Sequence, residues 1–335
     1  MNAQLITKYK TANKLILAAN NMLLLTHHNP DGDGLSSLCA MIEYLNTLNK
    51  KYFAYCDNQP PKTFDFIKNI SQINYKTPTA EQIQNETNQP LNFSAHDLIL
   101  IFDCGSLSRT KLNQAILSRS DKQLIIEFDH HPKVDDFSDL EIRDTDSAAT
   151  AEIIYNFFKV NNLEINKNTA KALLTGLITD TANFLYPSAT NLTIDAASDL
   201  ITKGAHLSEL TDRTLRNKSL DSMKLWGKIM SSLQINPQYK IAFAVLAAED
   251  FKLYKVEKEE LEGISGFLSN LKDVNALVFI REEGDGIIRG SLRTSHSNID
   301  VSKLAHLLGG GGHPKASGFS INGKLIKIND HWQIT

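Results

Sequence analysis

The first half of the chain alternates short apolar runs with segments of helical periodicity. Residues 22–26 and 52–56 are apolar runs of strand length, and residues 35–48 between them repeat apolar side chains at helical spacing. Two further runs, LILIFD at 98–103 and LIIEFD at 124–129, are apolar at consecutive positions, as in strands buried on both faces of a parallel sheet. The pattern predicts an α/β fold with a Rossmann-like parallel sheet in its N-terminal domain.

Helical periodicity continues beyond these strands. It predicts helices at 148–159, 169–180 and 191–203, and a polar, largely helical stretch at 206–233. Earlier in the chain, residues 77–94 are polar and aperiodic, and we expect a surface excursion there rather than a domain boundary. The N-terminal half is therefore expected to be one layered α/β domain.

A different pattern begins near residue 236. Strand-like runs at 241–247, 276–281 and 287–294 surround a predicted helix at 257–270, which is typical of a small mixed α/β layer. The predicted organisation is an N-terminal domain at 1–205, a helical connector at 206–235 and a smaller C-terminal domain with a mixed sheet at 236–335.

Composition narrows the classes of partner. The chain has 335 residues, of which 42% are hydrophobic, so it can bury a core in each of two domains. Its 35 Lys and Arg against 38 Asp and Glu leave a net charge of -3, which disfavours extended, sequence-blind binding of long nucleic-acid duplexes. A small anionic substrate in a local pocket is compatible with this charge.

The cysteines and the apolar stretches of the chain indicate the cellular compartment in which the protein is expected. The three cysteines, Cys39, Cys56 and Cys104, form no CxxC pair and are odd in number, which favours a reducing compartment over a disulfide framework. No stretch approaches the roughly 18 to 20 apolar residues of a membrane span, and the N-terminus lacks an apolar signal core. We therefore expect a cytoplasmic protein with no membrane partner.

Polar residues gather where the predicted strands end. The segment THHNPDGD at 26–33 follows the first strand, Asp103 ends the LILIFD run, and a DHH triplet at 129–131 ends the LIIEFD run. Asp180 lies in GLITDT at the end of a predicted helix. Open parallel sheets bind their ligands beyond the carboxyl ends of the strands, so these side chains are candidates for chemistry.

Each of these residues also has a structural alternative. An aspartate after a strand is commonly a helix cap or a turn former. Four such segments in a chain with ten histidines are a stronger signal than any one of them alone. Carboxylate oxygens with imidazole nitrogens and no thiolate suit Mn²⁺, and Mg²⁺, Co²⁺ or Zn²⁺ less specifically.

The segments THHNPDGDG, IFDCGS, FDHHP and GLITDT, in that order, resemble the motifs of the DHH phosphoesterase superfamily. GGGGHPKASG at 309–318 resembles the glycine-rich signature of the DHH-associated C-terminal domain, so the resemblance spans nearly the whole chain. It implies a catalytic metal-binding domain, a substrate-binding domain and an active site in the cleft between them. Within the superfamily, the length and the C-terminal signature are most similar to the nanoRNase A family.

The resemblance also implies roles for the metal-binding motifs. Two divalent ions, Mn²⁺ first with Mg²⁺ or Co²⁺ as alternatives, would lie side by side and be bridged by Asp103. The ligands implied for one ion are His27, Asp31 and Asp103, and those for the other are Asp33, Asp103, His130 and Asp180. His131 is implied to face the scissile phosphate as a catalytic residue together with Asp103. Asp129 is implied to orient the histidines, with a purely structural role as the alternative.

The implied substrate-binding residues lie mainly in the C-terminal domain. Glycines let a ligand approach the backbone at Gly310, Gly311 and Gly312, and His313 adds a hydrogen-bonding ring; a tight turn is the structural alternative. Arg293 resembles a family position that grips a substrate phosphate through a bidentate guanidinium. The weaker candidates, for which surface charge is the alternative, are Arg109, Arg289 and Lys315.

The preferred interpretation is hydrolysis of very short oligonucleotides, and of the 3′-phosphate of adenosine 3′,5′-bisphosphate (pAp), to mononucleotides. A phosphodiesterase for cyclic di-AMP or a linear dinucleotide is the main alternative, because it would use the same metals. An inorganic pyrophosphatase is expected to lack the GGGGHP segment, and a RecJ-like processive nuclease needs a longer basic or aromatic track. A catalytically silent nucleotide sensor would lack metal ligands, and here every implied ligand is present.

Two positions depart from the family pattern. Ser36 stands where the family commonly has glycine, so close helix packing there is expected to differ. His28 lies beside the implied ligand His27; the spacing to Asp31 favours His27 but leaves an exchange of the two open. The resembling family commonly forms homodimers, and no residue pattern in this chain tests that.

Overall fold

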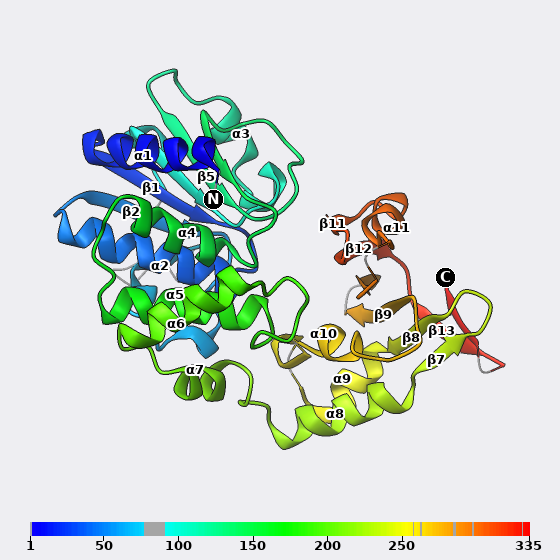
Figure 1. The fold of residues 1–335 in the computed structure, drawn as a ribbon. Coiled ribbons are helices and arrows are strands. Elements are labelled where there is room, and N and C mark those ends of the chain that lie inside the picture. Colours follow the sequence, from blue (N-terminus) through cyan, green and yellow to red (C-terminus); the bar gives the residue numbers. More distant parts are fainter. Residues whose placement is uncertain are drawn as a thin grey trace. The chain divides into compact units, whose positions relative to one another are not determined.

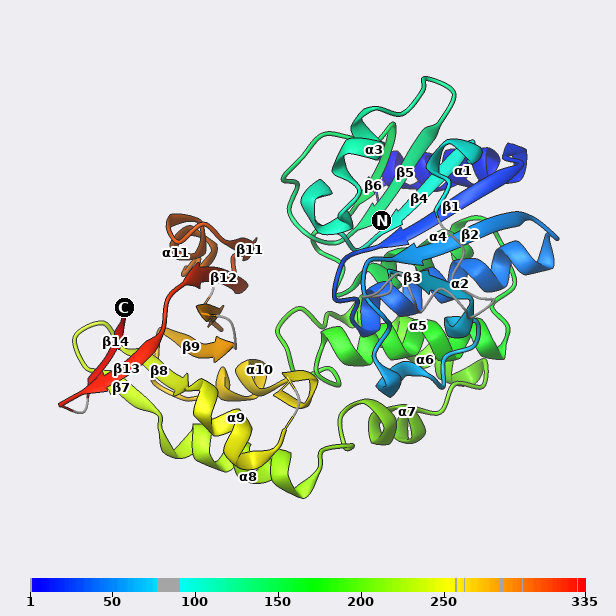
Figure 2. The same ribbon diagram turned by 180° about the vertical axis from the view of Figure 1, so that it is seen from behind.

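The computed structural model describes most of the chain, which divides into two compact units. The described residues are 2–76, 91–256, 258–261, 263–283, 286–296, 298–329 and 331–335. The first unit is Met1–Arg216 and the second is Asn217–Thr335, and each is considered by itself (Figures 1 and 2). Most of the surface excursion predicted at 77–94 lies outside the described residues.

The first unit is built on a six-stranded parallel sheet in the order β3-β2-β1-β4-β5-β6. Its strands are β1 (Asn21–Thr26), β2 (Lys51–Cys56), β3 (Ile73–Tyr75), β4 (Leu98–Phe102), β5 (Leu124–Asp129) and β6 (Leu140–Arg143). Every residue of β4 is buried, because both faces of the sheet are covered. The predicted α/β fold with a Rossmann-like N-terminal sheet is confirmed.

Helices and 3₁₀ turns form the layers on either side of this sheet. They are α1 (Ala3–Ala18), α2 (Gly32–Thr47), η1 (Lys62–Phe64), η2 (Ile70–Gln72), η4 (Phe93–Ala95), η5 (Leu107–Thr110), α3 (Asn113–Leu117), α4 (Thr150–Val160), α5 (Lys167–Asp180), α6 (Asn191–Thr202) and α7 (Leu207–Thr214). The larger core packs Met22 and Leu24 of β1 against α1, α2, α4 and α5. The smaller core packs Leu23 and Leu25 against η5 and α3 on the opposite face. Alternate residues of one strand thus serve two cores.

The register of the central strands brings the predicted motifs to one edge. Phe102 of β4 pairs with Thr26 of β1 and with Phe128 of β5. His27 and Asp103 therefore leave the sheet at the level where Asp129 ends β5, at the carboxyl ends of the strands. In Figure 1, α2 runs beside α5, with which it packs.

The second unit contains a mixed sheet in the order β11-β12-β10-β9-β8-β7, in which β8 and β9 are parallel and the other pairs antiparallel. Its strands are β7 (Gln234–Asn236), β8 (Ile241–Leu246), β9 (Ala276–Glu283), β10 (Ile287–Arg293), β11 (Gly311–His313) and β12 (Ala316–Asn322), and β13 (Leu325–Ile328) and β14 (His331–Ile334) form a separate hairpin. Its helical elements are α8 (Leu220–Ser231), α9 (Ala248–Tyr254), η6 (Lys258–Leu261), α10 (Ile264–Leu268) and α11 (Ser302–Leu307). The predicted mixed-sheet C-terminal domain is confirmed.

Two helical stretches differ in detail from the sequence pattern. The helix predicted at 257–270 is shorter: the described residues there form η6 and α10, because Gly263 adopts a left-handed conformation with φ 90° between them. The stretch at 206–233 divides between the units. Helix α7 packs on α5 in the first unit, whereas α8 contributes Leu225 and Ile229 to the core of the second.

None of the helices that the structure describes is long and apolar enough to cross a membrane.

Candidate metal centre

The loop after β1 presents three of the predicted ligands. Asp31 caps α2, and its Oδ1 accepts hydrogen bonds from the backbone N–H groups of Asp33 and Gly34, both at 3.1 Å. A Cβ at Gly34 would lie 2.4 Å from the Thr26 hydroxyl, so only glycine lets the first turn of α2 pack this closely on β1. The segment from His27 to Asp33 therefore folds into a tight turn that brings its two carboxylates to the start of α2.

His27 and His28 point to different surroundings. Nδ1 of His27 lies 2.8 Å from the His28 carbonyl, so Nδ1 carries a proton and Nε2 is the atom left for a metal. That Nε2 is buried and has no hydrogen-bond partner among the described residues; it lies 3.5 Å from Asp31 Oδ1 and 3.6 Å from Asp103 Oδ2. His28 instead directs its Nδ1 to the Arg109 carbonyl at 3.2 Å. The geometry favours His27 over His28 as the ligand.

Asp103, His130 and Asp180 come close to the loop residues. His130 Nε2 lies 3.5 Å from Asp103 Oδ1 and 3.7 Å from Asp180 Oδ2. The possible ligand atoms fall into three groups, within each of which all atoms lie within 4.8 Å: His27, Asp31 and Asp103; Asp33, His130 and Asp180; and Asp103, His130 and His131. All the metal ligands predicted from the sequence are therefore brought together in the first unit.

The spacing of these atoms suits shared ions better than direct hydrogen bonds. The four distances between histidine nitrogens and carboxylate oxygens, 3.5 to 3.7 Å, exceed the roughly 2.7–3.2 Å of a hydrogen bond. Two ligand atoms that are each about 2.1 Å from one ion, at octahedral or tetrahedral angles, lie about 3.0–3.4 Å apart, so the observed distances need to shorten only by a few tenths of an ångström around an ion. The orphaned Nε2 of His27 also faces two carboxylates. The residues present thus fit divalent cations.

The crowding of charges shifts several pKa values. Burial disfavours the charged form of His27, but nearby carboxylates, Asp31 foremost, outweigh it and raise the pKa to about 9. Burial likewise opposes the charge on His130, and Asp180 foremost raises that pKa to about 9. Burial, then repulsion between carboxylates, raises the pKa of Asp33 well above its ordinary value, and burial raises that of Asp180 to about 6. Bound cations would take the place of these protons.

His131 is oriented by a buried carboxylate. Asp129 Oδ1 lies 2.9 Å from the His131 Nδ1 and also accepts the His131 backbone N–H at 2.8 Å. Burial alone would raise the pKa of Asp129, but the hydrogen bond from His131 and the charge of Arg143 hold it below its ordinary value. His131 Nδ1 is 3.5 Å from Asp103 Oδ1, and the shorter contact to Asp129 already engages it. The Nε2 of His131 is therefore the ring nitrogen that Asp129 does not engage.

Arg109 is the one predicted substrate-binding residue of the first unit. Its carbonyl accepts a hydrogen bond from the His28 backbone N–H at 2.8 Å, which ties η5 to the loop after β1. A Cβ at Gly105 would lie 3.3 Å from both Arg109 Nη1 and His131 Cγ. The guanidinium and the imidazole therefore border the same small space, and Arg109 lies beside the candidate centre.

Thr150 contacts two of the carboxylates although no motif singled it out. Its Oγ1 donates to Asp103 Oδ1 at 2.9 Å, and its backbone N–H donates to Asp33 Oδ2 at 2.6 Å. The residue is fully buried at the start of α4. Its hydroxyl meets a carboxylate 47 positions away in the chain, so a threonine at a predicted helix start gave no local signal of this contact.

In the second unit, Arg293 and His313 lie at one end of the mixed sheet. Ala316 of β12 pairs with Arg293 of β10 on one side and with His313 of β11 on the other. Residues in direct register project to the same face, so both side chains leave one face of the sheet, with Cα atoms about 10 Å apart. Arg293 Nη1 donates to the carbonyls of Leu292 at 3.0 Å and Ser317 at 3.4 Å. These two candidates are thus gathered in a separate unit from the metal ligands.

The two weaker candidates of this unit make contacts within it. Arg289 Nε lies 3.0 Å from Glu283 Oε2. The ammonium of Lys315 donates to the carbonyls of His296 and Ile299. These contacts give each cation a structural role without a substrate.

Packing within the chain itself explains part of the glycine run at 309–312. A Cβ at Gly310 would lie 2.1 Å from a carbonyl oxygen of β12, and Gly312 has φ 133°, a conformation that favours glycine. At Gly311 the nearest atom would be on the ring of His306 at 3.3 Å, and a side chain can move. The packing of β11 on β12 therefore requires glycine at 310 and 312, and of these three positions 311 is the least constrained by the chain.

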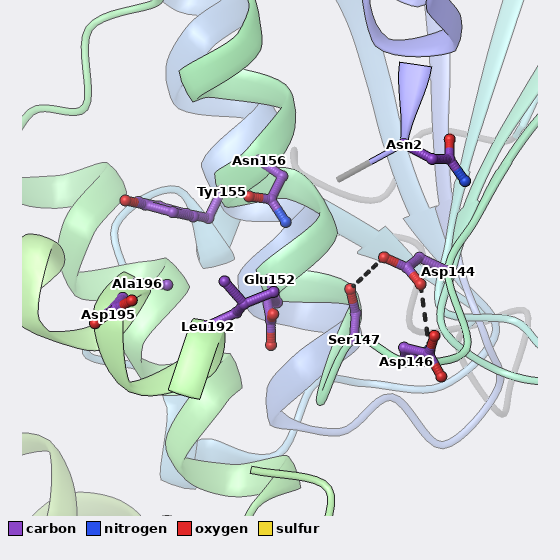
Figure 3. A pocket seen from close by; sticks show the side chains of 10 residues that line it. All are labelled: Asn2, Asp144, Asp146, Ser147, Glu152, Tyr155, Asn156, Leu192, Asp195 and Ala196. Atoms are coloured by element: carbon purple, nitrogen blue, oxygen red, sulfur yellow. Dashed lines mark hydrogen bonds between the residues drawn. The ribbon is translucent and has the colours of Figure 1, made fainter. Parts of the chain in front are cut away.

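A cavity of about 430 Å³ in the first unit has a different character (Figure 3). Its acidic lining residues are Asp144, Asp146, Glu152 and Asp195. The described residues that line it include no predicted metal ligand and no basic side chain, so the cavity would repel a phosphate. We do not assign the substrate to this cavity.

Comparison with known families defines the class. Residues 21–177 match the model of the DHH family, N-terminal domain, and residues 239–331 match the DHHA1 domain. The chain therefore carries a DHH domain followed by a DHHA1 domain, and the resemblance to the DHH phosphoesterases is confirmed.

Individual relatives cover most of the chain. The bifunctional oligoribonuclease and PAP phosphatase NrnA of Bacillus subtilis (strain 168) is 25% identical over 305 residues, which are 90% of this chain and 90% of its own. Its counterpart in Thermus thermophilus is 26% identical and matches 89% of this chain and 83% of its own.

Solved structures show the same fold. An exopolyphosphatase-related protein from Bacteroides fragilis has a TM-score of 0.83 at 23% identity, covering 95% of this chain and 92% of its own. RecJ from Thermus thermophilus in complex with Mn²⁺ has a TM-score of 0.52 at 13% identity, covering 96% of this chain and 52% of its own. At these identities the likeness concerns the fold alone.

Proposed function

We propose that this chain is a metal-dependent phosphoesterase that hydrolyses very short oligonucleotides and removes the 3′-phosphate of pAp, releasing mononucleotides. The DHH and DHHA1 domains support the class of reaction. Two relatives named as oligoribonuclease and PAP phosphatase, which match 90% and 89% of the chain, support the substrates. The observation that carries the proposal is the convergence of the motif carboxylates and histidines into three overlapping groups, one of which contains the orphaned Nε2 of His27.

In this proposal the cluster holds two divalent ions. One ion would be held by His27, Asp31 and Asp103, and the other by Asp33, His130 and Asp180. Asp103, which also groups with His130, would be the ligand shared by both ions. A divalent cation bound here would polarise phosphoryl oxygens and lower the pKa of a coordinated water. Carboxylate oxygens and imidazole nitrogens favour Mn²⁺, with Mg²⁺ and Co²⁺ as further candidates.

The catalytic roles of the chain's own groups follow from their surroundings. Asp103 is the one carboxylate that takes part in two of the three ligand groups of the described residues, which supports a role as the shared ligand. Asp129 holds Nδ1 of His131, so Nε2 is the ring nitrogen left to face a phosphate oxygen. Arg109 borders the same space and can neutralise the developing negative charge on the phosphate.

The second unit would bind the rest of the substrate. Arg293 carries a guanidinium on the same sheet face as His313, and such a fork can take a terminal phosphate in a bidentate manner. The backbone at Gly311, which the chain's own packing constrains least of the three glycines at 310–312, can approach a base or sugar. Anchoring a terminal phosphate favours short substrates with a free end over long duplexes.

The test is a substrate panel with the purified protein. After removal of metals with a chelator, the protein is supplied with Mn²⁺, Mg²⁺ or Co²⁺ and incubated separately with pAp, a dinucleotide, a long RNA, cyclic di-AMP and pyrophosphate. We expect metal-dependent release of mononucleotides from the dinucleotide and of phosphate from pAp. The long RNA should be cut far more slowly.

Other outcomes lead elsewhere. Turnover of cyclic di-AMP alone would instead indicate a phosphodiesterase of cyclic-dinucleotide signalling, with the same metal centre and a different substrate pocket. Nucleotide binding without turnover under any of the three metals would contradict the proposal and indicate a nucleotide sensor.

A further inference from the structure

We propose that Thr150 is a positioning residue of the metal centre, which fixes the carboxylates of Asp103 and Asp33 relative to each other. The inference rests on the proposed function, because the two carboxylates need a fixed separation only if they hold metal ions. Thr150 itself would contact neither substrate nor ion. It acts through the carboxylates that it holds.

The Asp103 carboxylate has little other support. Its two oxygens lie 3.5 Å or more from the nearest histidine nitrogens, which is too far for hydrogen bonds. The 2.9 Å hydrogen bond from the Thr150 hydroxyl is the one hydrogen bond made to this carboxylate in the described part of the chain. Asp103 also has a left-handed backbone with φ 60° directly after β4, so it sits outside the regular strand geometry. The hydroxyl therefore decides where the proposed bridging oxygen points.

The same residue takes part in holding Asp33. The first N–H groups of a helix have no partner within it, and here those of Thr150 and Ala151 donate to Asp33 Oδ2 at 2.6 Å and Oδ1 at 2.8 Å. The positive end of the α4 dipole also favours this carboxylate. Asp33 is 1% exposed, so water does not replace these donors. One turn of α4 thus supports carboxylates proposed for both ions.

The start of α4 is itself anchored from the other side. Glu152 is 3% exposed, and its Oε2 accepts hydrogen bonds from the Ala148 backbone N–H at 3.1 Å and from the Thr193 hydroxyl of α6 at 2.8 Å. Glu152 lies in the acidic cavity of Figure 3, where it projects from α4 near Leu192 and Ala196 of α6. These bonds oppose a shift of α4 and so help to hold the donors of Thr150 in place.

Three substitutions distinguish the effect of the Thr150 hydroxyl from the effect of side-chain packing. Thr150→Val keeps the branched shape and the backbone N–H but removes the donor to Asp103. Thr150→Ser keeps the donor and removes only a methyl group. Thr214→Val is the matched control, since Thr214 is buried in α7 and its hydroxyl donates to the Leu210 carbonyl at 2.7 Å.

The measurement is the affinity for Mn²⁺ alone, by isothermal titration calorimetry on chelator-stripped protein, beside the melting temperature of the metal-free protein. Loss of a residue that orients a ligand typically costs about 10–100-fold in metal affinity, and we expect a loss of that size for Thr150→Val. Thr150→Ser should recover most of the affinity. Thr214→Val should bind Mn²⁺ as the wild type does.

Two results would overturn the inference. One is wild-type Mn²⁺ affinity in Thr150→Val; the other is an equal loss in Thr150→Ser, which would assign the effect to packing. If the melting temperature shows that Thr150→Val does not fold, Thr150→Ala takes its place, since it too lacks the hydroxyl and keeps the N–H. Wild-type Mn²⁺ affinity in Thr150→Ala would likewise contradict the inference.

The failure of the proposed function has a different signature. If the wild-type protein binds Mn²⁺ but hydrolyses none of the substrates, the proposed function is refuted. The Mn²⁺ affinities of the variants still test the positioning role of Thr150. A wild-type protein that binds no Mn²⁺, Mg²⁺ or Co²⁺ overturns both.

Discussion

The two units hold their candidate functional residues in different ways. In the first unit, the proposed ligands come from separate segments of the chain, and His27, Asp33 and Asp103 are at most 2% exposed. In the second unit, Arg293 and His313 lie on the two strands that flank β12 in one sheet and remain partly exposed. A metal centre needs fixed geometry, which burial and long-range hydrogen bonds supply, whereas a surface that binds a substrate needs access.

The difference also teaches how far a motif can be trusted. The DHH motifs of the first unit converge on one place, and each ligand atom has a neighbour of complementary chemistry. The glycine run of the second unit is just as conspicuous in the sequence, yet Gly310 and Gly312 are already explained by the close packing of β11 on β12. The comparison therefore predicts that changes in the first unit act on metal binding and changes in the second on substrate binding or stability.

The largest effect is expected from Asp103→Ala. The shared carboxylate is removed, and because metal-ion stabilisation of the transition state is worth several kcal/mol, turnover should fall about 1000-fold or more. Mn²⁺ affinity, measured by calorimetry, should fall with it. Asp199→Ala is the control, since Asp199 accepts a hydrogen bond from the Tyr155 hydroxyl at 3.0 Å and is not among the proposed ligands. Undiminished turnover in Asp103→Ala would refute the two-metal proposal.

The Arg293→Gln substitution should weaken substrate binding by the second unit without changing metal binding by the first. A charge-assisted hydrogen bond to a phosphate is worth about 1.5–3 kcal/mol, so kcat/KM for pAp should fall about 10- to 100-fold while Mn²⁺ affinity stays unchanged. The control is Arg216→Gln, which removes an exposed guanidinium that pairs with Asp212 at 3.2 Å. A comparable loss of metal affinity in Arg293→Gln would contradict the assignment of metal binding to the first unit and substrate binding to the second.

Gly310→Ala and Gly311→Ala test the two roles of the glycine run. The new methyl group at 310 would overlap the β12 backbone, so we expect a loss of about 1–3 kcal/mol in the free energy of unfolding. At 311 it would meet only the movable ring of His306, so stability should change little and KM should rise if substrate approaches there. Denaturant unfolding and steady-state kinetics measure the pair; equal stability of the two variants would contradict this account.

The pH dependence of metal binding should be the most graded effect. In the metal-free protein, burial opposes the charge on His27 and His130, but the surrounding carboxylates raise both pKa values to about 9. Binding must release these protons, so below that pH the Mn²⁺ affinity should fall about tenfold per pH unit for each proton displaced. Calorimetry in buffers of different ionisation enthalpy counts the protons. An affinity that is flat between about pH 6 and pH 8 would show that the ligands bind no protons without metal.

The sequence by itself determined the elements and the chemistry available to them. Apolar runs such as 98–103 and 124–129 predict buried parallel strands, because local spacing reports which faces are covered. Residues that end such strands must meet at one edge of the sheet, so the convergence of Asp103 and the DHH triplet at 129–131 followed from topology.

The tertiary structure decided how these residues are supported. The choice of His27 over His28 depends on which way each ring turns, and the place of Arg109 beside His131 depends on the path of η5. The contact between Thr150 and Asp103 joins positions that no local pattern relates. Periodicity records that a side chain is buried but not what it meets, because the partner is set by the packing of distant elements such as α4 on the end of β4.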